Sequence, residues 1–188
     1  MSTKLQVETA RLIIRPYRRE DYKEWARSYN ERLPNQHRHD AGFDGSHYSK
    51  KWFQNEIEAY HLEAEADETY VLGVFRKEDD AHIGEVELIP ILRTDYHWAM
   101  MGYMVHNQFQ RQGYGKEAIV AAVEMFFKEL KIHRIELQID VDNKPSLQFA
   151  ESLGFQFECK REEFFFEEGR WIDQLIYTKT NKKAGITR

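Results

Sequence analysis

The sequence has one cysteine, Cys159, among 188 residues, and it has no long hydrophobic run. One cysteine excludes an intrachain disulfide and fits a reducing compartment, so we expect a cytoplasmic chain with Cys159 as a small, partly buried side chain. The opening MSTKLQVETARL lacks the apolar segment of a signal peptide. No stretch approaches the ~20 apolar residues of a membrane-spanning helix, and no membrane partner is expected.

An excess of positive charge is also missing. The formal net charge is −5 and the sequence pI is about 5.9, which argues against general nucleic-acid binding and suits a cationic partner. Aromatic residues make up 14% of the chain, which favours a well-packed core. Without repeats or a low-complexity linker, the length predicts a single domain over residues 1–180 and a flexible tail over residues 181–188.

Hydrophobic periodicity predicts strands and helices in the order β-α-α-β-β-β-α-β-α-β-β. This order indicates an α/β (α+β) fold, with a mixed, mostly antiparallel seven-stranded sheet flanked by helices on both faces. The expected strands span 12–17, 69–77, 82–89, 97–105 and 133–140, with two more inside 155–179 that meet near Glu168-Gly169. The expected helices span 19–31, Ser46 or Ser49 to about 66, 115–130 and 143–153.

Two glycines open the helix that follows the strand at 97–105. They lie in the stretch NQFQRQGYGKEA, residues 107–118, which contains Gly113 and Gly115. A helix N-terminus offers free N–H groups and partial positive charge, and glycines let an anion approach that backbone closely. The stretch also fits a plain tight turn. It lacks the G-x-G-x-x-G and GK[ST] patterns, so it does not indicate NAD or a nucleoside triphosphate.

The stretch QRQGYG (110–115), followed by DVDNKPSLQFAESLGF (140–155), resembles the GNAT superfamily of acyl-CoA-dependent N-acyltransferases. The segments ETARLIIRPYRREDY (8–22) and REEFFFEEGRWIDQLIY (161–177) resemble one branch, the Rim-type enzymes, which acetylate the N-terminal amines of ribosomal proteins. The resemblance covers nearly the whole chain. It implies a GNAT-like fold, acetyl-CoA as cosubstrate and an amine as acceptor. The charge and the residue spacing predict no nucleic-acid partner and no metal.

The resemblance also implies a set of cofactor-binding residues. Backbone amides of the glycine loop would hold the pyrophosphate, and the end of strand 97–105 would splay from strand 133–140 and bind the pantetheine arm and the thioester carbonyl. Asn143 would bond the arm, although by its position it also fits a helix cap. Ser146 would steady or protonate the leaving thiolate, although it also fits an ordinary first-turn residue. The full set is Met104, Val105, Gln110, Arg111, Gln112, Gly113, Tyr114, Gly115, Lys116, Asn143 and Ser146.

Two positions depart from the family pattern and leave the general base open. Many superfamily members carry a tyrosine acid where this chain has Ala150, and many relatives in the branch carry a glutamate where it has Met100. We therefore predict Ser146 and Glu163 as the catalytic pair. Glu163 matches a glutamate that faces the acceptor in Rim-type enzymes. Glu85 and His97 are alternative bases, and Glu85 also fits a charge on a solvated strand face.

Because the sequence has no obvious general base, an acceptor amine with a low pKa is favoured. Removing a proton at pH 7 costs about 1 kcal/mol for an α-amine and about 4.5 kcal/mol for a lysine amine. A protein N-terminal α-amine is therefore the expected acceptor. A small molecule such as a polyamine, amino sugar or antibiotic, a longer acyl group, and a non-catalytic acyl-CoA-binding module remain alternatives, and a homodimer is compatible with the sequence.

The loop at 33–49 contains three histidines, His37, His39 and His47, which lack the carboxylate or cysteine spacing of a metal site. We expect this loop to shape the acceptor pocket, with a plain surface loop as the alternative. Glu56, Glu58, Glu63 and Glu65 share a face of the next helix, which is either solvated or attracts a basic acceptor.

Overall fold

The computed structural model describes residues 5–36, 38–40 and 48–182. The strands are β1 (Val7–Glu8), β2 (Leu12–Pro16), β3 (Tyr70–Arg76), β4 (His82–Leu92), β5 (Trp98–Val105), β6 (Arg134–Asp140), β7 (Gln156–Glu167) and β8 (Arg170–Thr180). The helices are α1 (Tyr22–Asn30), α2 (Lys50–Glu65), α3 (Tyr114–Glu129) and α4 (Lys144–Ser152). Short 3-10 turns lie at η1 (Arg19–Asp21) and η3 (Asn107–Phe109).

The predicted element order is confirmed, with one strand added at the start. The added strand is β1, which pairs antiparallel with β2 and makes the sheet eight-stranded rather than seven-stranded. Its two residues are too short to give a periodic pattern. The predicted strand at 82–89 is longer than expected and runs to Leu92, while Ser49 is the residue that caps α2, accepting from the Trp52 N–H.

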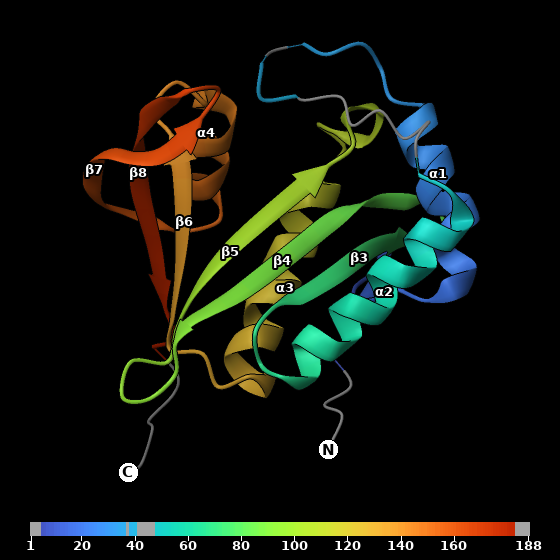
Figure 1. The fold of residues 1–188 in the computed structure, drawn as a ribbon, viewed down its shortest axis with the longest axis horizontal. Helices are drawn as coiled ribbons and strands as arrows, with labels where there is room; N and C mark the ends of the chain where they lie inside the picture. Colours follow the sequence, from blue (N-terminus) through green and yellow to red (C-terminus); the bar gives the residue numbers. More distant parts are fainter. Residues whose placement is uncertain (1–4, 37, 41–47, 183–188) are drawn as a thin grey trace.

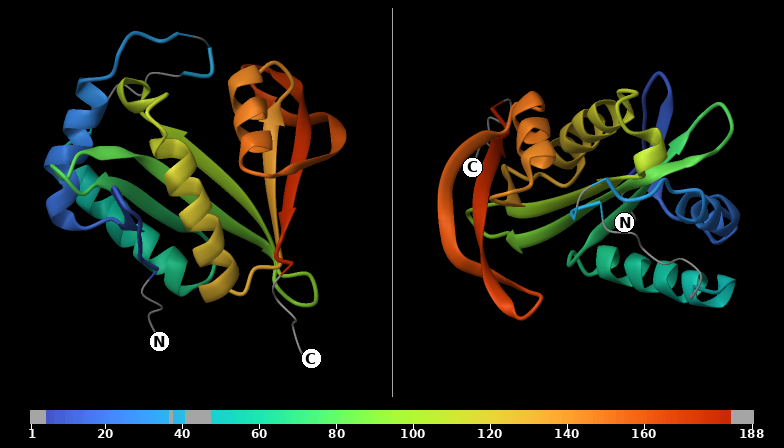
Figure 2. Two further views of the ribbon diagram at one scale, coloured as in Figure 1. Left: turned by 180° about the vertical axis from the view of Figure 1, so that it is seen from behind. Right: turned by 90° about the horizontal axis from the view of Figure 1, so that it is seen from above.

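The sheet order is β1-β2-β3-β4-β5-β6-β8-β7, and every neighbouring pair is antiparallel except β5 and β6. Helices α1 and α2 cover one face of the sheet, and α3 and α4 cover the other (Figures 1 and 2). Each face therefore has its own core. The core under α1 and α2 is formed by aromatic and aliphatic side chains of Tyr17, Trp25, Phe53, Ile57, Val71 and Phe75.

The strands β5 and β6 stay paired only at one end. Their register joins Trp98 to Arg134 and Met100 to Glu136, and beyond these residues the two strands diverge (Figure 1). This divergence is the splay that the family resemblance implies. It leaves the edge of β5 unpaired over Met101–Val105, with α3 and α4 on one side and the segment after α1 above it.

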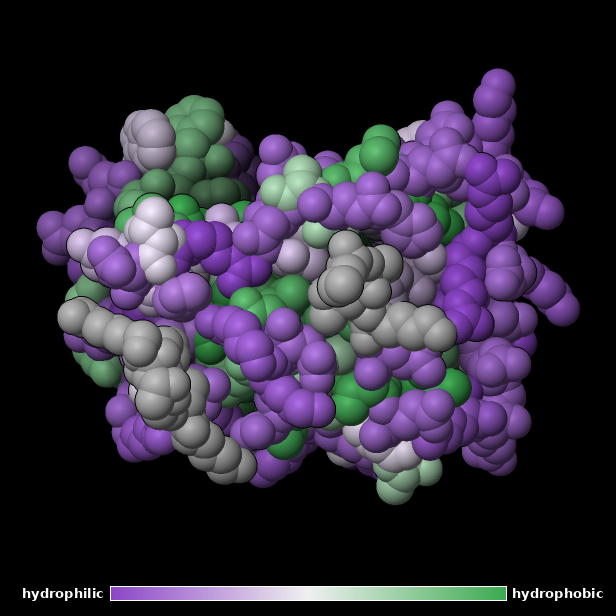
Figure 3. All heavy atoms as spheres, turned by 90° about the horizontal axis from the view of Figure 1, so that it is seen from below, coloured by the Kyte–Doolittle hydropathy of each residue, from purple (hydrophilic) through white to green (hydrophobic). Residues whose placement is uncertain are grey.

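Among the described residues, no helix has the length and apolar character needed to cross a membrane. The face seen from below is mostly hydrophilic, with smaller hydrophobic areas between the charged side chains (Figure 3). The β7–β8 hairpin is different, because it exposes Phe164, Phe165, Phe166 and Trp171. Cys159 on β7 is half-buried, as expected.

Candidate active site

The glycine loop turns tightly into α3. Gly113 is the N-cap residue, with φ +82°, and Arg111 has φ +59°. The loop is held from below by Arg11, whose Nη1 donates to the Gln112 carbonyl at 3.0 Å and whose guanidinium lies 4.4 Å from the centre of the Tyr114 ring. Because the first-turn N–H groups of a helix have no acceptor within that helix, the start of α3 presents free donors. Arg111 and the nearby Lys116 are exposed beside them.

Gly115 lies against two other parts of the predicted site. A Cβ atom at this position would come within 3.2 Å of Phe149 Cζ on α4 and 3.3 Å of Val105 Cγ2 on β5. Such contacts are tighter than ordinary van der Waals packing, so the start of α3 meets the end of β5 and the side of α4 at this glycine. Phe149 is partly buried and packs against the core.

The end of β5 offers backbone groups at its unpaired edge. The His106 N–H donates to the Ile83 carbonyl of β4 at 3.0 Å, so the backbone groups of the preceding residue, Val105, point the other way. The Val105 carbonyl accepts from Gln110 Nε2 at 3.1 Å, which agrees with that direction. The Val105 N–H, rather than that of Met104, therefore faces the opened side of β5.

Helix α4 begins as the sequence predicted. The Asn143 side chain caps it by accepting from the Ser146 N–H at 3.2 Å, Pro145 lies in the first turn, and Gly154 follows the helix with φ +79°. Asn143 therefore has a structural role as a helix cap. The nitrogen of its side-chain amide is still a candidate hydrogen-bond donor to a ligand. The Ser146 hydroxyl lies 3.1 Å from the Tyr103 hydroxyl of β5, which brings α4 and β5 together.

Tyr103 is a candidate functional residue that the sequence analysis missed. Burial raises the pKa of its hydroxyl, and the hydrogen bond with Ser146 acts in the opposite direction. Its ring meets Phe149 edge-on, with centroids 5.3 Å apart. A signal was available, because strand alternation puts Tyr103 on the same face as Val105. Many superfamily members have a tyrosine acid at the position of Ala150, and Tyr103 lies on the same side of the site.

The opposite face of the same strands carries carboxylates. Glu85 pairs with Met104 across β4 and β5, and its Oε2 accepts from the Tyr17 hydroxyl at 2.8 Å. Burial is the main cause that raises the pKa of Glu85, with Glu87 adding to the rise and the Tyr17 bond opposing it. Burial also raises the pKa of Glu87. The interpretation of Glu85 as a solvated charge is wrong, because α1 and α2 cover this face.

A buried hydrogen-bonded chain extends from Tyr17. Its hydroxyl lies 2.8 Å from His82 Nε2, and His82 Nδ1 lies 3.1 Å from His106 Nε2. The Ser28 hydroxyl lies 2.9 Å from both of these imidazole nitrogens and also donates to a backbone carbonyl of α1. Burial lowers the pKa of His82 to about 3 and that of His106 to about 2, so both rings are neutral near pH 7. The chain ends at Arg32, whose Nη1 lies 3.4 Å from His106 Nδ1.

The two remaining base candidates lie elsewhere. Glu163 is exposed on β7, at an irregularity between Arg161 and Phe165, with φ +48°, and its N–H donates to Asp173 Oδ1 at 2.9 Å. No bond to Ser146 is formed by its side chain among the described residues, and its catalytic role stays a prediction. His97 precedes β5, about 25 Å of extended strand away from Val105, so it is too distant to be the base.

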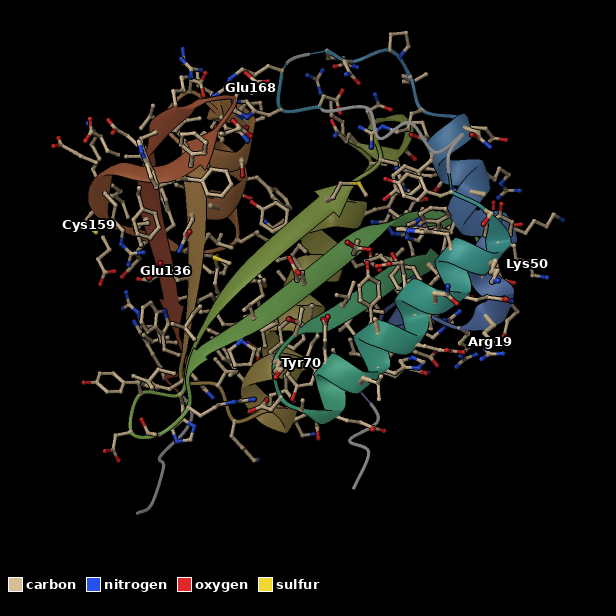
Figure 4. The ribbon with its side chains drawn as sticks, in the orientation of Figure 1. Arg19, Lys50, Tyr70, Glu136, Cys159 and Glu168 are labelled. Carbon is tan, nitrogen blue, oxygen red and sulfur yellow. The ribbon has the colours of Figure 1, made fainter. Side chains whose placement is uncertain are left out.

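The segment after α1 reaches across to β6 and β7. Arg38 Nη2 lies 2.7 Å from Asp142 and 3.0 Å from Asp140, and Arg38 Nη1 lies 3.5 Å from Glu167. Figure 4 labels Glu168, in the adjoining β7–β8 turn, beside this segment. His39 joins the two aspartates, and their donor atoms lie within 4.8 Å, but Arg38 already supplies the positive charge. His37 and His47 lie outside the described residues.

Comparisons with known proteins agree with this geometry. The model of the Acetyltransferase (GNAT) domain family matches residues 11–156, which include the glycine loop, β5 and α4. The protein named Probable N-acetyltransferase YjcK of Bacillus subtilis (strain 168) is 31% identical over 135 residues, covering 72% of this chain and 75% of the relative.

Two Rim-type proteins are also similar to the chain. The [Ribosomal protein uS5]-alanine N-acetyltransferase of Escherichia coli (strain K12) is 26% identical over 124 residues, which cover 66% of this chain and 62% of the relative. The crystal structure of ribosomal-protein-S5-alanine acetyltransferase from Vibrio fischeri superposes with a TM-score of 0.77 at 18% identity, covering 95% of this chain and 97% of that one. The second likeness concerns the fold alone.

Proposed function

Because the chain belongs to the GNAT acetyltransferase family, we propose that it transfers the acetyl group of acetyl-CoA to a protein N-terminal α-amine. It is an acetyl-CoA-dependent N-acetyltransferase, and the α-amine is the part that we propose. The observation that supports acetyl transfer is the meeting of α3, β5 and α4 at Gly115, beside Val105 and Phe149, with the Tyr103–Ser146 pair also joining β5 to α4.

The residues present fit acetyl-CoA. The free N–H groups of Arg111–Lys116 suit a pyrophosphate, because a helix N-terminus attracts anions. The absence of a Cβ at Gly115 leaves the backbone accessible where a side chain would crowd Val105 and Phe149. When bound, acetyl-CoA supplies an activated acetyl thioester. The Val105 N–H would donate to its carbonyl oxygen, where negative charge develops as the amine attacks.

The chain's polar groups have distinct parts in the transfer. The acceptor ammonium gives up two protons in all, and its nitrogen forms a bond to the acetyl carbon as the carbon–sulfur bond breaks. The electron pair of that bond leaves on sulfur, where Ser146 or Tyr103 donates a proton, and the second proton reaches solvent. A tyrosine whose pKa is raised by burial stays protonated at neutral pH, as a proton donor must. Glu163 and Glu85 are the candidates for the group that takes the amine proton.

Two arguments support an α-amine acceptor. Because the pKa of an α-amine is lower, the free energy needed to deprotonate it at pH 7 is about 3 to 4 kcal/mol smaller than for a lysine side chain. One relative is named as an acetyltransferase of a ribosomal protein's alanine, and the likeness spans about two-thirds of this chain. The half-buried carboxylates of Glu85 and Glu87 also suit a cationic small molecule such as a polyamine, which is the second candidate acceptor.

The binding half of the proposal is tested by thermal unfolding with CoA and acetyl-CoA. A ligand at one hundred times its dissociation constant should stabilise the fold by about 2.7 kcal/mol. Adenosine, which has no pyrophosphate, is the control and should shift the midpoint far less. Equal shifts of the unfolding midpoint with adenosine and CoA would show that the glycine loop does not bind pyrophosphate and is a plain turn.

The acceptor is tested by following free thiol release from acetyl-CoA across an amine panel. The panel contains a peptide with only its α-amine free, the same peptide with only a lysine amine free, and spermidine. We expect the α-amine peptide to give the highest kcat/KM. Preference for spermidine would select the second candidate, and a thermal shift with no thiol release from any amine would indicate a binding module.

A further inference from the structure

We propose that Glu85 accepts the proton of the acceptor amine and that the buried chain Tyr17–His82–His106–Arg32 holds its carboxylate ionised and fixed in place. The inference rests on the proposed function, since it assigns a group to that reaction. Glu85 would be the catalytic residue in this scheme. Tyr17, His82 and His106 would be positioning residues, because they act only through Glu85.

The strand register places Glu85 at the reacting end of β5. Glu85 is the Cα partner of Met104, and residues that are opposite each other in an antiparallel pair project from the same face. Val105, whose N–H faces the opened edge, is the next residue along β5. Glu85 therefore borders the site from the α1–α2 side, while Tyr103 and Ser146 border it from the α3–α4 side. An amine and a leaving sulfur must approach the carbonyl carbon from different directions, as this arrangement allows.

The two ends of the chain fix its direction. Arg32 can only donate, so His106 Nδ1 must accept, and His106 carries its proton on Nε2. At the other end, the Glu85 carboxylate can only accept, so the Tyr17 hydroxyl donates to it. The Tyr17 oxygen then accepts from His82 Nε2, which leaves His82 Nδ1 as an acceptor for His106. Along Arg32, His106, His82 and Tyr17 the donors therefore point toward Glu85, while the Ser28 hydroxyl beside both imidazoles donates to the Trp25 carbonyl.

Arg32 sets the tautomer of His106, and Arg32 is itself fixed by Asp40, with a contact of 3.0 Å. A donor aimed at a carboxylate favours the ionised form, which opposes the effect of burial. The chain uses only Oε2 of Glu85, and Oε1 has no hydrogen bond to a described residue. The structure thus leaves one oxygen of a fixed carboxylate for an incoming amine.

Other titratable groups surround Glu85 and contribute to its proton affinity. Burial raises the pKa of Tyr29 on α1 and of Tyr60 on α2 above the usual range, and Glu85 adds to both shifts. Neither tyrosine ionises near neutral pH. The groups that face this region are Tyr17 after β2, Tyr29 and Arg32 from α1 and its end, Glu56, Tyr60 and Glu63 from α2, and Glu87 from β4.

The proposed step is a simple proton transfer. Glu85 Oε1 takes one proton from the acceptor ammonium, and the nitrogen lone pair so released attacks the acetyl carbon. The neutral carboxylic acid then returns its proton to solvent before the next turnover. Neither imidazole needs to change its protonation state during the step.

The main test replaces the carboxylate with its neutral isostere. Glu85→Gln keeps an oxygen for the Tyr17 hydroxyl, so the chain survives, and kcat should fall about 10²-fold or more at pH 7. The loss should shrink as the pH rises and the amine deprotonates in solution. Glu163→Gln is the rival variant. Wild-type kcat in Glu85→Gln together with a 10²-fold loss in Glu163→Gln would overturn the proposal.

The positioning role is tested by a pair of matched tyrosine variants. Tyr17 and Tyr177 are both buried, with 3% and 6% exposure, and each hydroxyl donates to a glutamate, Glu85 and Glu151. Tyr17→Phe removes a bond that lowers the pKa of Glu85, so the acidic limb of the kcat–pH profile should move to higher pH. Tyr177→Phe should leave the profile in place. Equal profiles for Tyr17→Phe and Tyr177→Phe would refute the positioning role.

These outcomes separate the inference from the function on which it rests. If the wild-type protein releases no thiol with any amine, the proposed function fails before Glu85 is tested. If the wild-type protein is active and Glu85→Gln matches it across the pH range, only the assignment of Glu85 fails. Circular dichroism and CoA binding of each variant show that it is folded, and Glu85→Asp is the second variant, expected to recover part of the lost activity.

Discussion

The two faces of β4 and β5 carry different kinds of chemical groups. On the α3–α4 face, the groups are backbone N–H donors, glycines and two hydroxyls, those of Tyr103 and Ser146. On the α1–α2 face, they are carboxylates and neutral imidazoles held by buried hydrogen bonds, as at Glu85 and His82. The first set suits a phosphate-bearing thioester and the second suits a cationic amine.

In the proposed reaction, this difference would let the sheet separate the two substrates. Neighbouring residues on one strand project to opposite faces, so Met104 joins the amine side and Val105 joins the thioester side. Because β6 leaves β5 after Met100, the edge of the strand becomes a place where the two sides meet. A sheet with β5 and β6 paired throughout would keep them apart.

The largest effect is expected from closing the thioester face at Gly115. Gly115→Val would place a branched side chain where even a Cβ lies 3.2 Å from Phe149 and 3.3 Å from Val105. Losing two charge-assisted hydrogen bonds to phosphate, at roughly 2 kcal/mol each, should weaken CoA binding about 10³-fold. Isothermal titration calorimetry measures the affinity, and circular dichroism checks the fold. A folded Gly115→Val protein that binds CoA normally would show that α3 does not hold the cofactor.

The next effect concerns the amine face and appears as a pH dependence of stability. The folded pKa values of His82 and His106, about 3 and about 2, lie far below the value near 6.5 of an unfolded chain. As the pH falls below 6.5, the two imidazoles become protonated in the unfolded state but stay neutral in the folded state, so the free energy of unfolding falls. Each histidine should lower the free energy of unfolding by about 1.6 kcal/mol between pH 6.5 and pH 5.

Glu85 and Glu87 offset part of this loss, because carboxyls with raised pKa values take up protons in the folded state first. The histidine contribution is isolated by comparing wild type with His106→Gln in urea unfolding at pH 7, 6 and 5. The stability of the variant should fall less steeply with pH than that of the wild type. Parallel slopes would mean that His106 has the same pKa in the folded and unfolded states.

The element order was predictable, because each helix and most strands carry a clear hydrophobic period. The short β1 was not, since a two-residue strand leaves no pattern. The glycine turn into α3 and the Asn143 cap of α4 could be predicted because each lies in a local motif, while the role of Ser146 stays a prediction. The direction of the Val105 N–H depends on pairing with β4, which no local pattern encodes.

Glu85 was interpreted wrongly for a related reason. Alternation shows that Glu85 lies opposite the apolar face, but it does not say whether water or a helix covers its own face. Here α2 covers it, and the carboxylate becomes a half-buried acceptor. The contact between Tyr103 and Ser146, 43 residues apart in sequence, likewise required the fold before it could be recognised.

The smallest effect is expected from Tyr103, which would share the proton for the leaving sulfur with Ser146. Tyr103→Phe keeps the ring against Phe149 and removes only the hydroxyl, so CoA affinity should be unchanged while kcat falls roughly 10-fold, since Ser146 remains as a donor. Ser146→Ala should have a similar effect, and the double variant should lose little more than either single variant, because the two hydroxyls lie 3.1 Å apart and act as a unit. Tyr177→Phe is the control, with normal kcat expected. Fully additive losses would show that Tyr103 and Ser146 act independently, and normal kcat in Tyr103→Phe would leave protonation of the sulfur to Ser146 or water.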